Sequence, residues 1–398
     1  MSHSALSNFI NDGVWRIICR LAFKRVRVIG KELLPEQGCI LFVATHRNGA
    51  LDAAPYSITA PLAIAMVSAQ LQRLPLGRFL FRGIPVARAK DKARGIKADN
   101  IRAFADCVAV LKQGKQLFIL PEGTSTLGPQ HLPFKKGAAR IISRAMAAGA
   151  TPCIVPLAVH YEAATRWQSR VEVLIGEPIV PQTSEEEMLQ QMICTGLESF
   201  GANFSDWQTQ EAAEILALVS SQSRGNSYAL ALKYFSQALS EQSKNIVQQL
   251  KSLAKQNNWF LHQGLPLLPA KSWVLSLMHW LMLAPVVFGF CVLNLPVLAA
   301  GYSASRVLPD DSNVISFWGM AVGLPVAVLW VFIFNITLLW TANPIWLGLY
   351  WIVSAIGVAG WYDFGRLSVA LGNVFLRADS KADLINSYQQ LFEQMEHD

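Results

Sequence analysis

Residues 39–52 read Cys-Ile-Leu-Phe-Val-Ala-Thr-His-Arg-Asn-Gly-Ala-Leu-Asp and join an apolar run to a histidine and a carboxylate. The run from Cys39 to Ala44 predicts a strand, because it is short, apolar and bounded by turn residues. His46 follows the end of this strand, Asn48-Gly49 turns the chain, and Asp52 comes within the next helical turn. The stretch therefore predicts an α/β fold with polar chemistry at the end of a strand.

A histidine with a nearby carboxylate is typical of general-base chemistry. Histidine exchanges a proton near pH 7, and an aspartate on its other ring nitrogen fixes the tautomer and stabilises the imidazolium. The segment Gly123 to Leu127 approaches a nucleophile elbow but lacks the second glycine. We therefore expect His46 to act on a hydroxyl of a substrate. For an isolated pair, the alternative is a surface histidine in a turn.

The pair is one of four motifs that occur in order along residues 26–180. They are His46 to Asp52; Arg82-Gly83-Ile84-Pro85-Val86-Ala87-Arg88; Leu120-Pro121-Glu122-Gly123-Thr124-Ser125 with Leu132-Pro133-Phe134-Lys135-Lys136-Gly137-Ala138; and Ile154-Val155-Pro156-Leu157-Ala158-Val159. Together with the lead-in Val26 to Pro35, they resemble the glycerolipid acyltransferases, the 1-acylglycerol-3-phosphate and glycerol-3-phosphate acyltransferase family. Two departures stand out. Five residues separate His46 from Asp52 where four are common, and Ser125 stands where many phosphate-acceptor members carry arginine.

The resemblance implies roles for particular residues. It makes His46 and Asp52 catalytic, and it implies a substrate-binding set of Arg88, Glu122, Gly123, Thr124, Lys135 and Lys136. The structural alternatives are a salt bridge for Arg88, a helix-start carboxylate for Glu122 and a solvated helix start for the two lysines. We expect His131 and His160 to be structural, and backbone N–H groups near Gly83 or Gly123 to stabilise the oxyanion.

The resemblance further implies a membrane-bound O-acyltransferase of phospholipid biosynthesis. It would move a fatty acyl group from an acyl thioester, acyl-CoA or acyl carrier protein, to glycerol-3-phosphate or 1-acylglycerol-3-phosphate. Another lysolipid acceptor, a lysophospholipid or a lyso-aminolipid, is the first alternative, and a non-catalytic membrane-anchored lipid binder is the second. We expect no bound cofactor and no metal, because no His/Cys cluster has metal-ligand spacing.

Composition places the chain at a membrane. Of its 398 residues 52% are hydrophobic and only 15% are charged, which is apolar for a soluble protein. The net charge of +7 suits an anionic lipid surface, and no zinc-finger, RRM-like or basic-helix signature indicates nucleic acid. Six scattered cysteines without a CxxC motif are expected to be small core residues in a reducing compartment.

Short strands and longer helices alternate through the segment that carries the motifs, which predicts a largely parallel sheet. The expected strands are 39–44, 62–67, 117–120, 154–159 and 171–175, with helices over 101–112 and 136–148. The predicted fold class is thus an α/β acyltransferase domain, followed by a helical insert and a C-terminal transmembrane helical region.

Changes in composition divide the chain into five segments. These are an interfacial amphipathic helix (1–28), the catalytic domain (29–181), a helical insert (182–270), a membrane region with two or three apolar helices (271–365) and a cytoplasmic helical tail (366–398). In the first segment, apolar and basic residues interleave at helical spacing, which predicts Trp15 at headgroup depth. The alternative is an ordinary helix packed on the domain. In the insert we expect two or three helices with breaks near Gly201 and Gly225.

The apolar runs 274–300, 314–339 and 344–361 are each long enough to cross a bilayer, which takes ~20 residues. Basic residues flank the first run and follow the last one, which favours a cytoplasmic location for residue 271, the Arg306 loop and the tail. That arrangement requires a first run that is re-entrant or kinked at Pro285. Three full spans, with the tail outside, are the alternative. The expected location is the bacterial inner membrane or the endoplasmic reticulum, with the catalytic domain on the cytoplasmic face.

Overall fold

The computed structural model describes residues 3–73, 77–88, 91, 93, 95, 98–341 and 344–397. The chain divides into two compact units. The α/β unit comprises residues 1–20, 26–161 and 171–205, and the helical unit comprises residues 21–25, 162–170 and 206–398. The site of interest lies in the first, and the apolar helices lie in the second.

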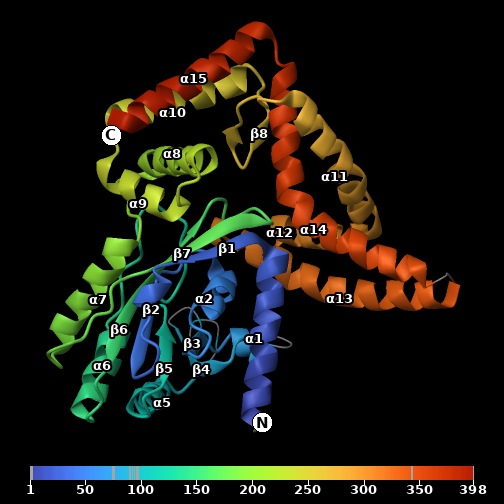
Figure 1. Ribbon diagram of the computed structural model, residues 1–398. Coiled ribbons are helices and arrows are strands. Elements are labelled where there is room, and N and C mark those ends of the chain that lie inside the picture. The colour runs from blue at the N-terminus through green and yellow to red at the C-terminus, as the bar shows by residue number, and fades with distance from the viewer. Residues whose placement is uncertain are drawn as a thin grey trace. The chain divides into compact units, whose positions relative to one another are not determined.

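A seven-stranded sheet forms the centre of the α/β unit (Figure 1). Its strand order is β1-β7-β6-β2-β5-β3-β4. The strands are β1 (Phe23–Ile29), β2 (Ile40–Ala44), β3 (Ile64–Ser68), β4 (Gly83–Val86), β5 (Gln116–Ile119), β6 (Cys153–Tyr161) and β7 (Ser169–Ile175). β2 pairs in parallel with both β5 and β6, β3 pairs in parallel with β4 and β5, and β7 runs antiparallel to β6. The predicted largely parallel sheet is confirmed.

Helices cover both faces of this sheet. Side chains that alternate along the central strands, such as Leu41 and Val43, share one core with α5 (Asn100–Lys112), α6 (Gly137–Ala147) and α7 (Glu186–Phe200). Phe118 points to the other face, where it packs on Tyr56 of α2 (Ala53–Thr59). Every residue of β2 is buried, as expected for a strand inside a parallel sheet. His46 therefore follows a strand that is buried along its whole length.

The N-terminal helix differs from its prediction. α1 spans His3–Ala22 and does not continue to Val28, because Phe23 opens β1, in which the exposed Arg25 and Arg27 alternate with partly buried residues. Trp15 is only 7% exposed. Its Nε1 donates to the Leu80 carbonyl at 3.2 Å, and its ring packs edge-on against Phe81. The expected position of Trp15 at headgroup depth is thus wrong, since both its ring and its N–H are used within the α/β unit.

The predicted insert over residues 182–270 contains four helices, not two or three. After α7 come α8 (Trp207–Arg224), α9 (Tyr228–Ala238) and α10 (Glu241–Gln256), with the predicted breaks at Gly201 and Gly225. The side chains of Asp206, Ser227 and Ser240 cap the last three. The extra break comes at Leu239, where an extended residue separates α9 from the Ser240 cap. α7 belongs to the α/β unit and the others belong to the helical unit, so the predicted insert is divided between the two units.

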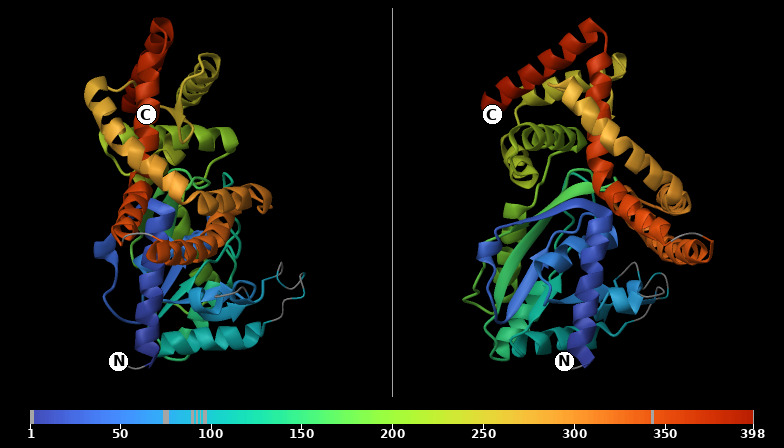
Figure 2. Two further views of the ribbon diagram at one scale, coloured as in Figure 1. Left: turned by 90° about the vertical axis from the view of Figure 1, so that its right-hand side faces the viewer. Right: turned by 45° about the vertical axis from the view of Figure 1, so that its right-hand side comes forward.

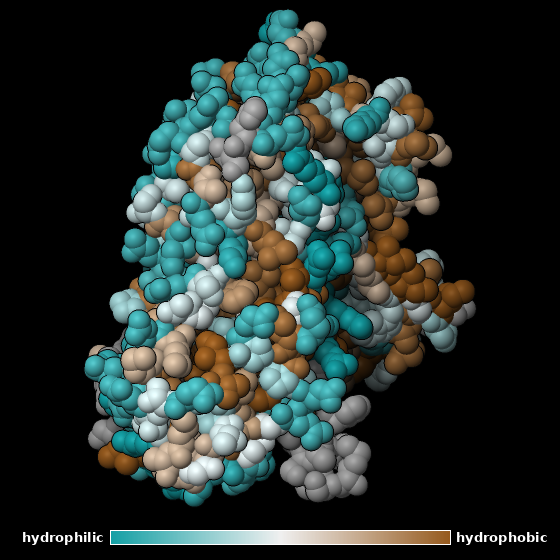
Figure 3. Space-filling model, turned by 60° about the vertical axis from the view of Figure 1, so that its left-hand side comes forward, coloured by the Kyte–Doolittle hydropathy of each residue, from teal (hydrophilic) through white to brown (hydrophobic). Residues whose placement is uncertain are grey.

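Three apolar helices of the helical unit are long enough to cross a membrane. The candidate spans among the described residues are Trp273–Leu293, Ser312–Trp340 and Ile345–Phe375. The first span is α11 (Trp273–Leu293). The second combines the 3-10 turn Ser312–Val314 with most of α13 (Ile315–Thr341), and the third combines α14 (Ile345–Gly372) with the 3-10 turn Asn373–Phe375. Exposed apolar side chains such as Phe288 and Phe332 line them, and a brown band of hydrophobic residues runs along one side of the surface in Figure 3.

The first apolar run breaks at Asn294 and not at Pro285. α11 continues through Pro285 to Leu293, and α12 (Leu295–Val307) begins after Asn294. The Asn294 side chain donates to the Phe290 carbonyl and to Ser354 Oγ at 3.1 Å each, and it accepts from Tyr350. These bonds satisfy polar groups freed where the helix stops. α11 lies alongside α14, and α12 lies alongside α13 (Figure 2).

The chain closes with a helix that returns to the helices before the membrane region. α15 (Ala378–His397) packs on α10 within the helical unit. Arg366, where we expected the tail to start, still lies inside α14. The hairpin of β8 (Leu261–His262) and β9 (Leu265–Pro266) precedes α11. All six cysteines are free thiols.

Candidate active site

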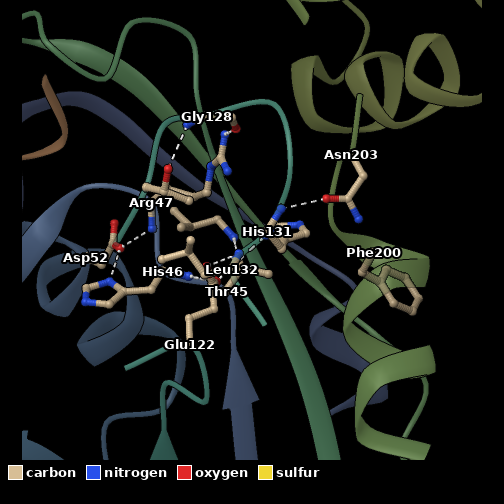
Figure 4. A network of polar contacts seen from close by, with 12 residues as sticks. Thr45, His46, Arg47, Asp52, Glu122, Gly128, His131, Leu132, Phe200 and Asn203 are labelled. Atoms are coloured by element: carbon tan, nitrogen blue, oxygen red, sulfur yellow. Dashed lines mark hydrogen bonds and ion pairs between the residues drawn. The ribbon is translucent and has the colours of Figure 1, made fainter. Parts of the chain in front are cut away.

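His46 and Asp52 form a hydrogen-bonded pair directly after β2 (Figure 4). His46 Nδ1 lies 2.8 Å from Asp52 Oδ2. Asp52 is completely buried and His46 is 8% exposed. Because Asp52 occupies Nδ1, the nitrogen that can accept a proton from a bound alcohol is Nε2. The geometry that the sequence predicted is present.

Main-chain groups hold the Asp52 carboxylate from the inner side of the turn. Its Oδ2 also accepts from the N–H groups of Arg47 at 2.7 Å and Asn48 at 3.0 Å. A 3-10 helix over Gly49–Asp52 closes this turn, and α2 starts directly after it. The tighter helix accommodates the fifth residue between the histidine and the aspartate and still returns the carboxylate to the ring.

A side chain that the sequence analysis did not single out donates a hydrogen bond to the other oxygen of the Asp52 carboxylate. The hydroxyl of Tyr161, the last residue of β6, donates to Asp52 Oδ1. Burial, followed by the charge of Asp52, raises the pKa of Tyr161 well above its usual value. The predicted strand stopped at Val159, and the observed strand runs to Tyr161. The signal that could have identified Tyr161 is the position of its strand, β6, beside β2 in the sheet.

Glu122 is buried beneath the pair and uses both carboxylate oxygens on the protein. Oε1 accepts from the His46 N–H at 2.8 Å, and Oε2 accepts from the Leu132 N–H at 3.2 Å. His131 Nδ1 lies 3.7 Å from Oε1. Glu122 is 1% exposed. The structure therefore places it as a support for the main chain of His46 and not as an open substrate ligand.

Arg88 lies beside the Gly123 loop, as its expected substrate-binding role requires. It also forms a salt bridge, which was the structural alternative to that role. Its Nε and Nη2 donate to the two oxygens of Asp91 at 2.9 and 3.0 Å, and its Nη1 donates to the Gly123 carbonyl at 3.2 Å. Burial alone would raise the pKa of Asp91, but the hydrogen bonds from Arg88 hold it below its usual value. The sequence gave no sign of Asp91. Because 27% of the Arg88 side chain stays exposed, its guanidinium can still meet an anion beside Gly123.

A second cation, the ammonium group of Lys135, also lies beside Gly123. Gly123 has a φ of +72°, and a Cβ added there would lie 2.5 Å from Lys135 Nζ, so the ammonium group lies directly over this glycine. The next residue, Thr124, is exposed. The N–H of Gly123 donates to the Leu120 carbonyl at 3.0 Å, so the expected oxyanion role of this group is not supported. Lys135 and Arg88 thus flank one backbone position.

Lys136 lies elsewhere. Its Nζ pairs with Glu187 of α7 at 2.9 Å on an exposed surface. Hydrogen bonding and the charge of Lys136 lower the pKa of Glu187. The solvated position is therefore the one observed for this lysine. His160, expected to be structural, bonds the Phe200 carbonyl through Nε2 at 3.2 Å.

A comparison with protein families covers the segment that holds this site. The family model described as Acyltransferase matches residues 25–160, about a third of the chain. Among solved structures, the chain is similar to the 1-acyl-sn-glycerophosphate (LPA) acyltransferase PlsC from Thermotoga maritima, at 22% identity and a TM-score of 0.33, covering 46% of this chain and 74% of that one. No curated protein matches the chain significantly. The matched segment contains the whole His46–Asp52 turn and both cations beside Gly123. Residues 25–160 thus form an acyltransferase domain, which contains the site described above.

Proposed function

We propose that this enzyme transfers a fatty acyl group from an acyl thioester to the free hydroxyl of glycerol-3-phosphate or 1-acylglycerol-3-phosphate at a membrane surface. The observation that carries the proposal is the buried His46–Asp52 pair, whose free nitrogen has no serine or cysteine partner among the contacts described for it. The group that gives its proton to Nε2 is therefore assigned to the substrate alcohol and not to a protein nucleophile.

The proposed reaction is a direct transfer. His46 Nε2 takes the hydroxyl proton while the alcohol oxygen bonds to the thioester carbonyl carbon. The C–S bond then breaks, and the leaving sulfur takes the proton back from the imidazolium. A thiol has a reference pKa of about 8.5, so it departs without a strong acid. General-base catalysis of this kind contributes roughly 10²- to 10⁴-fold in rate.

Two cations support a phosphate-bearing acceptor. Arg88 and Lys135 approach Gly123, and Glu122 links that loop to the main chain of His46. A phosphate bound there would be tied to the segment that carries the base. Charge-assisted hydrogen bonds to phosphate are the stronger kind. The donor is proposed to be a diffusible co-substrate, acyl-CoA or acyl carrier protein.

The helical unit supports a membrane location for this chemistry. Its three candidate spans expose apolar side chains almost throughout. Both the acceptor after one acylation and the product are lipids, so an enzyme that is held in the bilayer meets them without extracting them. We place the catalytic domain on the cytoplasmic face of the bacterial inner membrane or the endoplasmic reticulum, where acyl thioesters are made.

Purified full-length protein in lipid nanodiscs, given labelled acyl-CoA or acyl carrier protein and a panel of acceptors, tests the proposal. We expect ester formation with glycerol-3-phosphate or its 1-acyl derivative. His46→Ala and Asp52→Asn should each lower kcat by at least about 10³-fold in folded protein, because the first removes the base and the second leaves the wrong tautomer. Transfer only to an uncharged lysolipid would overturn the acceptor. Full turnover by folded His46→Ala protein would overturn the mechanism.

A further inference from the structure

We propose that Tyr161 is a positioning residue of the reaction, which sets the basicity of His46 through the carboxylate of Asp52. The inference rests on the proposed role of His46 as the base. It adds a third group to the pair, so that the chain of contacts runs from the phenol through Asp52 to the imidazole.

The sheet brings this residue to the pair. β2 and β6 are parallel neighbours in the register Ala44 to Leu157, and the N–H of Thr45 continues the pairing by donating to the Leu157 carbonyl at 3.1 Å. β6 then continues four residues beyond Leu157, to Tyr161. His46 follows the end of β2, and Tyr161 ends β6, so both reach the Asp52 turn from the same edge of the sheet.

The two oxygens of Asp52 have different partners. Oδ2 accepts from the His46 ring and from the N–H groups of Arg47 and Asn48, whereas Oδ1 accepts from Tyr161. Tyr161 is 8% exposed and Asp52 is fully buried. Because its pKa is raised, the phenol stays protonated and acts as the donor to the carboxylate.

Removal of the phenol hydroxyl should change the histidine in a defined direction. Asp52 would keep three N–H donors and stay ionised. Its charge, no longer shared with Tyr161, would stabilise the imidazolium more strongly. Tyr161→Phe should therefore raise the pKa of His46. Less free base would then be present at neutral pH, and the acid limb of kcat/KM should move to higher pH.

A purely structural hydrogen bond would behave differently, and the chain offers a matched control. Tyr56 is also buried, and its hydroxyl donates to the Thr45 carbonyl at 2.8 Å. Tyr56→Phe removes the same atom from the same neighbourhood, but it leaves the hydrogen bonds of Asp52 intact. It should cost stability without moving the acid limb.

The test measures kcat/KM against pH for the wild type, Tyr161→Phe and Tyr56→Phe. We expect the acid limb to shift upward by about 0.5–1 unit in Tyr161→Phe only, the scale of one lost charge-assisted bond. The same shift should appear in the ¹⁵N titration of the His46 ring, whose signal is assigned by its loss in His46→Ala. The ring titration does not depend on turnover. A shift in the ring without a shift in the rate profile would therefore support the positioning role and reject His46 as the base.

An unshifted ring in folded Tyr161→Phe, or equal shifts in both phenylalanine variants, would overturn the inference. If Tyr161→Phe does not fold, 3-fluorotyrosine placed at position 161 answers the same question. Its phenol is nearly the same size but more acidic, and so it is a stronger donor. The His46 pKa should then fall below that of the wild type. An unchanged or higher value would contradict the proposal.

Discussion

Lys135 and Lys136 are neighbours in the sequence, yet they serve different surfaces of the α/β unit. The ammonium group of Lys135 lies over Gly123, whereas Lys136 pairs with Glu187 in solvent. An exposed pair of that kind contributes little to stability. Of these two adjacent lysines, only Lys135 lies beside Gly123, where the proposed acceptor phosphate would bind.

Alanine variants of these two lysines should distinguish phosphate binding by Lys135 from a general effect of positive charge on the acceptor KM. Lys135→Ala should raise the KM for a phosphate acceptor roughly tenfold, because an ionic hydrogen bond contributes about 1.5–3 kcal/mol. The KM for the thioester should change little. Lys136→Ala removes the same charge and should leave both constants near those of the wild type. Equal effects of the two variants on the acceptor KM would indicate a general electrostatic effect and not a site beside Gly123.

The polar residues of the site could be predicted only where the chain itself brings them together. His46 and Asp52 lie within one turn, so their pairing followed from the sequence. The partners of the other groups come from distant segments: Tyr161 from β6 and Leu132 from the loop before α6. The sequence therefore predicted Glu122 as a substrate ligand, although its oxygens accept main-chain N–H groups. A motif identifies which residues are required but not which atom each of them contacts.

At the scale of single elements, Gly83 determines whether β3 and β4 can pair. It has a φ of +143°, and a Cβ at this position would lie 2.0 Å from the Ala65 carbonyl oxygen. Ala65 is its partner in the parallel register. Since backbone cannot withdraw from such a contact, any side chain would push the two strands apart.

Gly83→Ala should therefore destabilise the α/β unit severely, with a marked loss of Tm in detergent. Gly13→Ala is the control, because Gly13 lies inside α1 with nothing within 4 Å of the added Cβ. There, alanine should be neutral or stabilising by up to about 1 kcal/mol. A Gly83→Ala protein as stable as the wild type would show that the strands pair differently from the description given above.

Helices and strands, like the residues of the site, could be predicted where local sequence determines them and not where distant residues do. Strands 40–44, 64–68 and 153–161 and helices 100–112 and 137–147 were predicted within a few residues, because their apolar periodicity is strong. The end of α1 was misplaced because its basic and apolar residues suit a helix and an edge strand equally. The break at Asn294 depends on Ser354 and Tyr350 of α14, and no local pattern reveals such partners.

His262 gives the helical unit a defined dependence on pH. Its ring packs edge-on against Tyr362 at 4.8 Å. Burial, followed by the charges of Arg366, Arg170 and Arg166, lowers the pKa of His262 to about 4, against a weaker opposing effect of Asp363. The unfolded state therefore binds a proton near pH 6.5, whereas the folded state does not bind one until about pH 4.

The stability contributed by neutral His262 should be complete above about pH 6.5 and should decrease as the pH falls toward 4. Titration of this one group can change the unfolding equilibrium constant by at most about tenfold for each pH unit. Replacement by phenylalanine keeps a ring against Tyr362 without a titrating group. Unfolding followed by tryptophan fluorescence at pH 7.5, 6 and 5 should show a flatter pH dependence for His262→Phe than for the wild type. Parallel curves would exclude His262 as the source.

At the scale of the whole chain, the helices before and after the apolar region pack together. Trp259 donates to Ser380 of α15 at 2.8 Å, and Tyr388 of α15 donates to the Pro266 carbonyl at 2.5 Å, in both cases between buried residues. At the ends of the apolar helices, the N–H of Ala270 also bonds the Ala370 carbonyl. Segments that share a core cannot lie on opposite sides of a bilayer. This packing supports an even number of crossings between α10 and α15.

An even number requires one of the three apolar runs not to cross. The break at Asn294 makes the first run the candidate, with α13 and α14 as a spanning hairpin. Ser316, at the start of α13, donates to the Ala164 carbonyl at 2.6 Å in the connection between β6 and β7. The turn between α12 and α13 is therefore expected on the same side as both ends of the region.

Epitope tags can test this topology in the full-length protein. The sites are the exposed turn after Gly225, the exposed residues Asp310 and Asp311, and the C-terminus. All three should become labelled from the cytoplasmic side in sealed vesicles, and the protein should resist carbonate extraction, because α13 and α14 expose apolar surface that only lipid can cover. Each tagged protein should keep its acyl transfer activity, which controls for misfolding. A C-terminal tag labelled only from the opposite side would establish three crossings. The Trp259–Ser380 and Tyr388–Pro266 contacts could not then exist in the membrane, so this result would reject the packing of α15 on α10 while leaving the His46–Asp52 chemistry untouched.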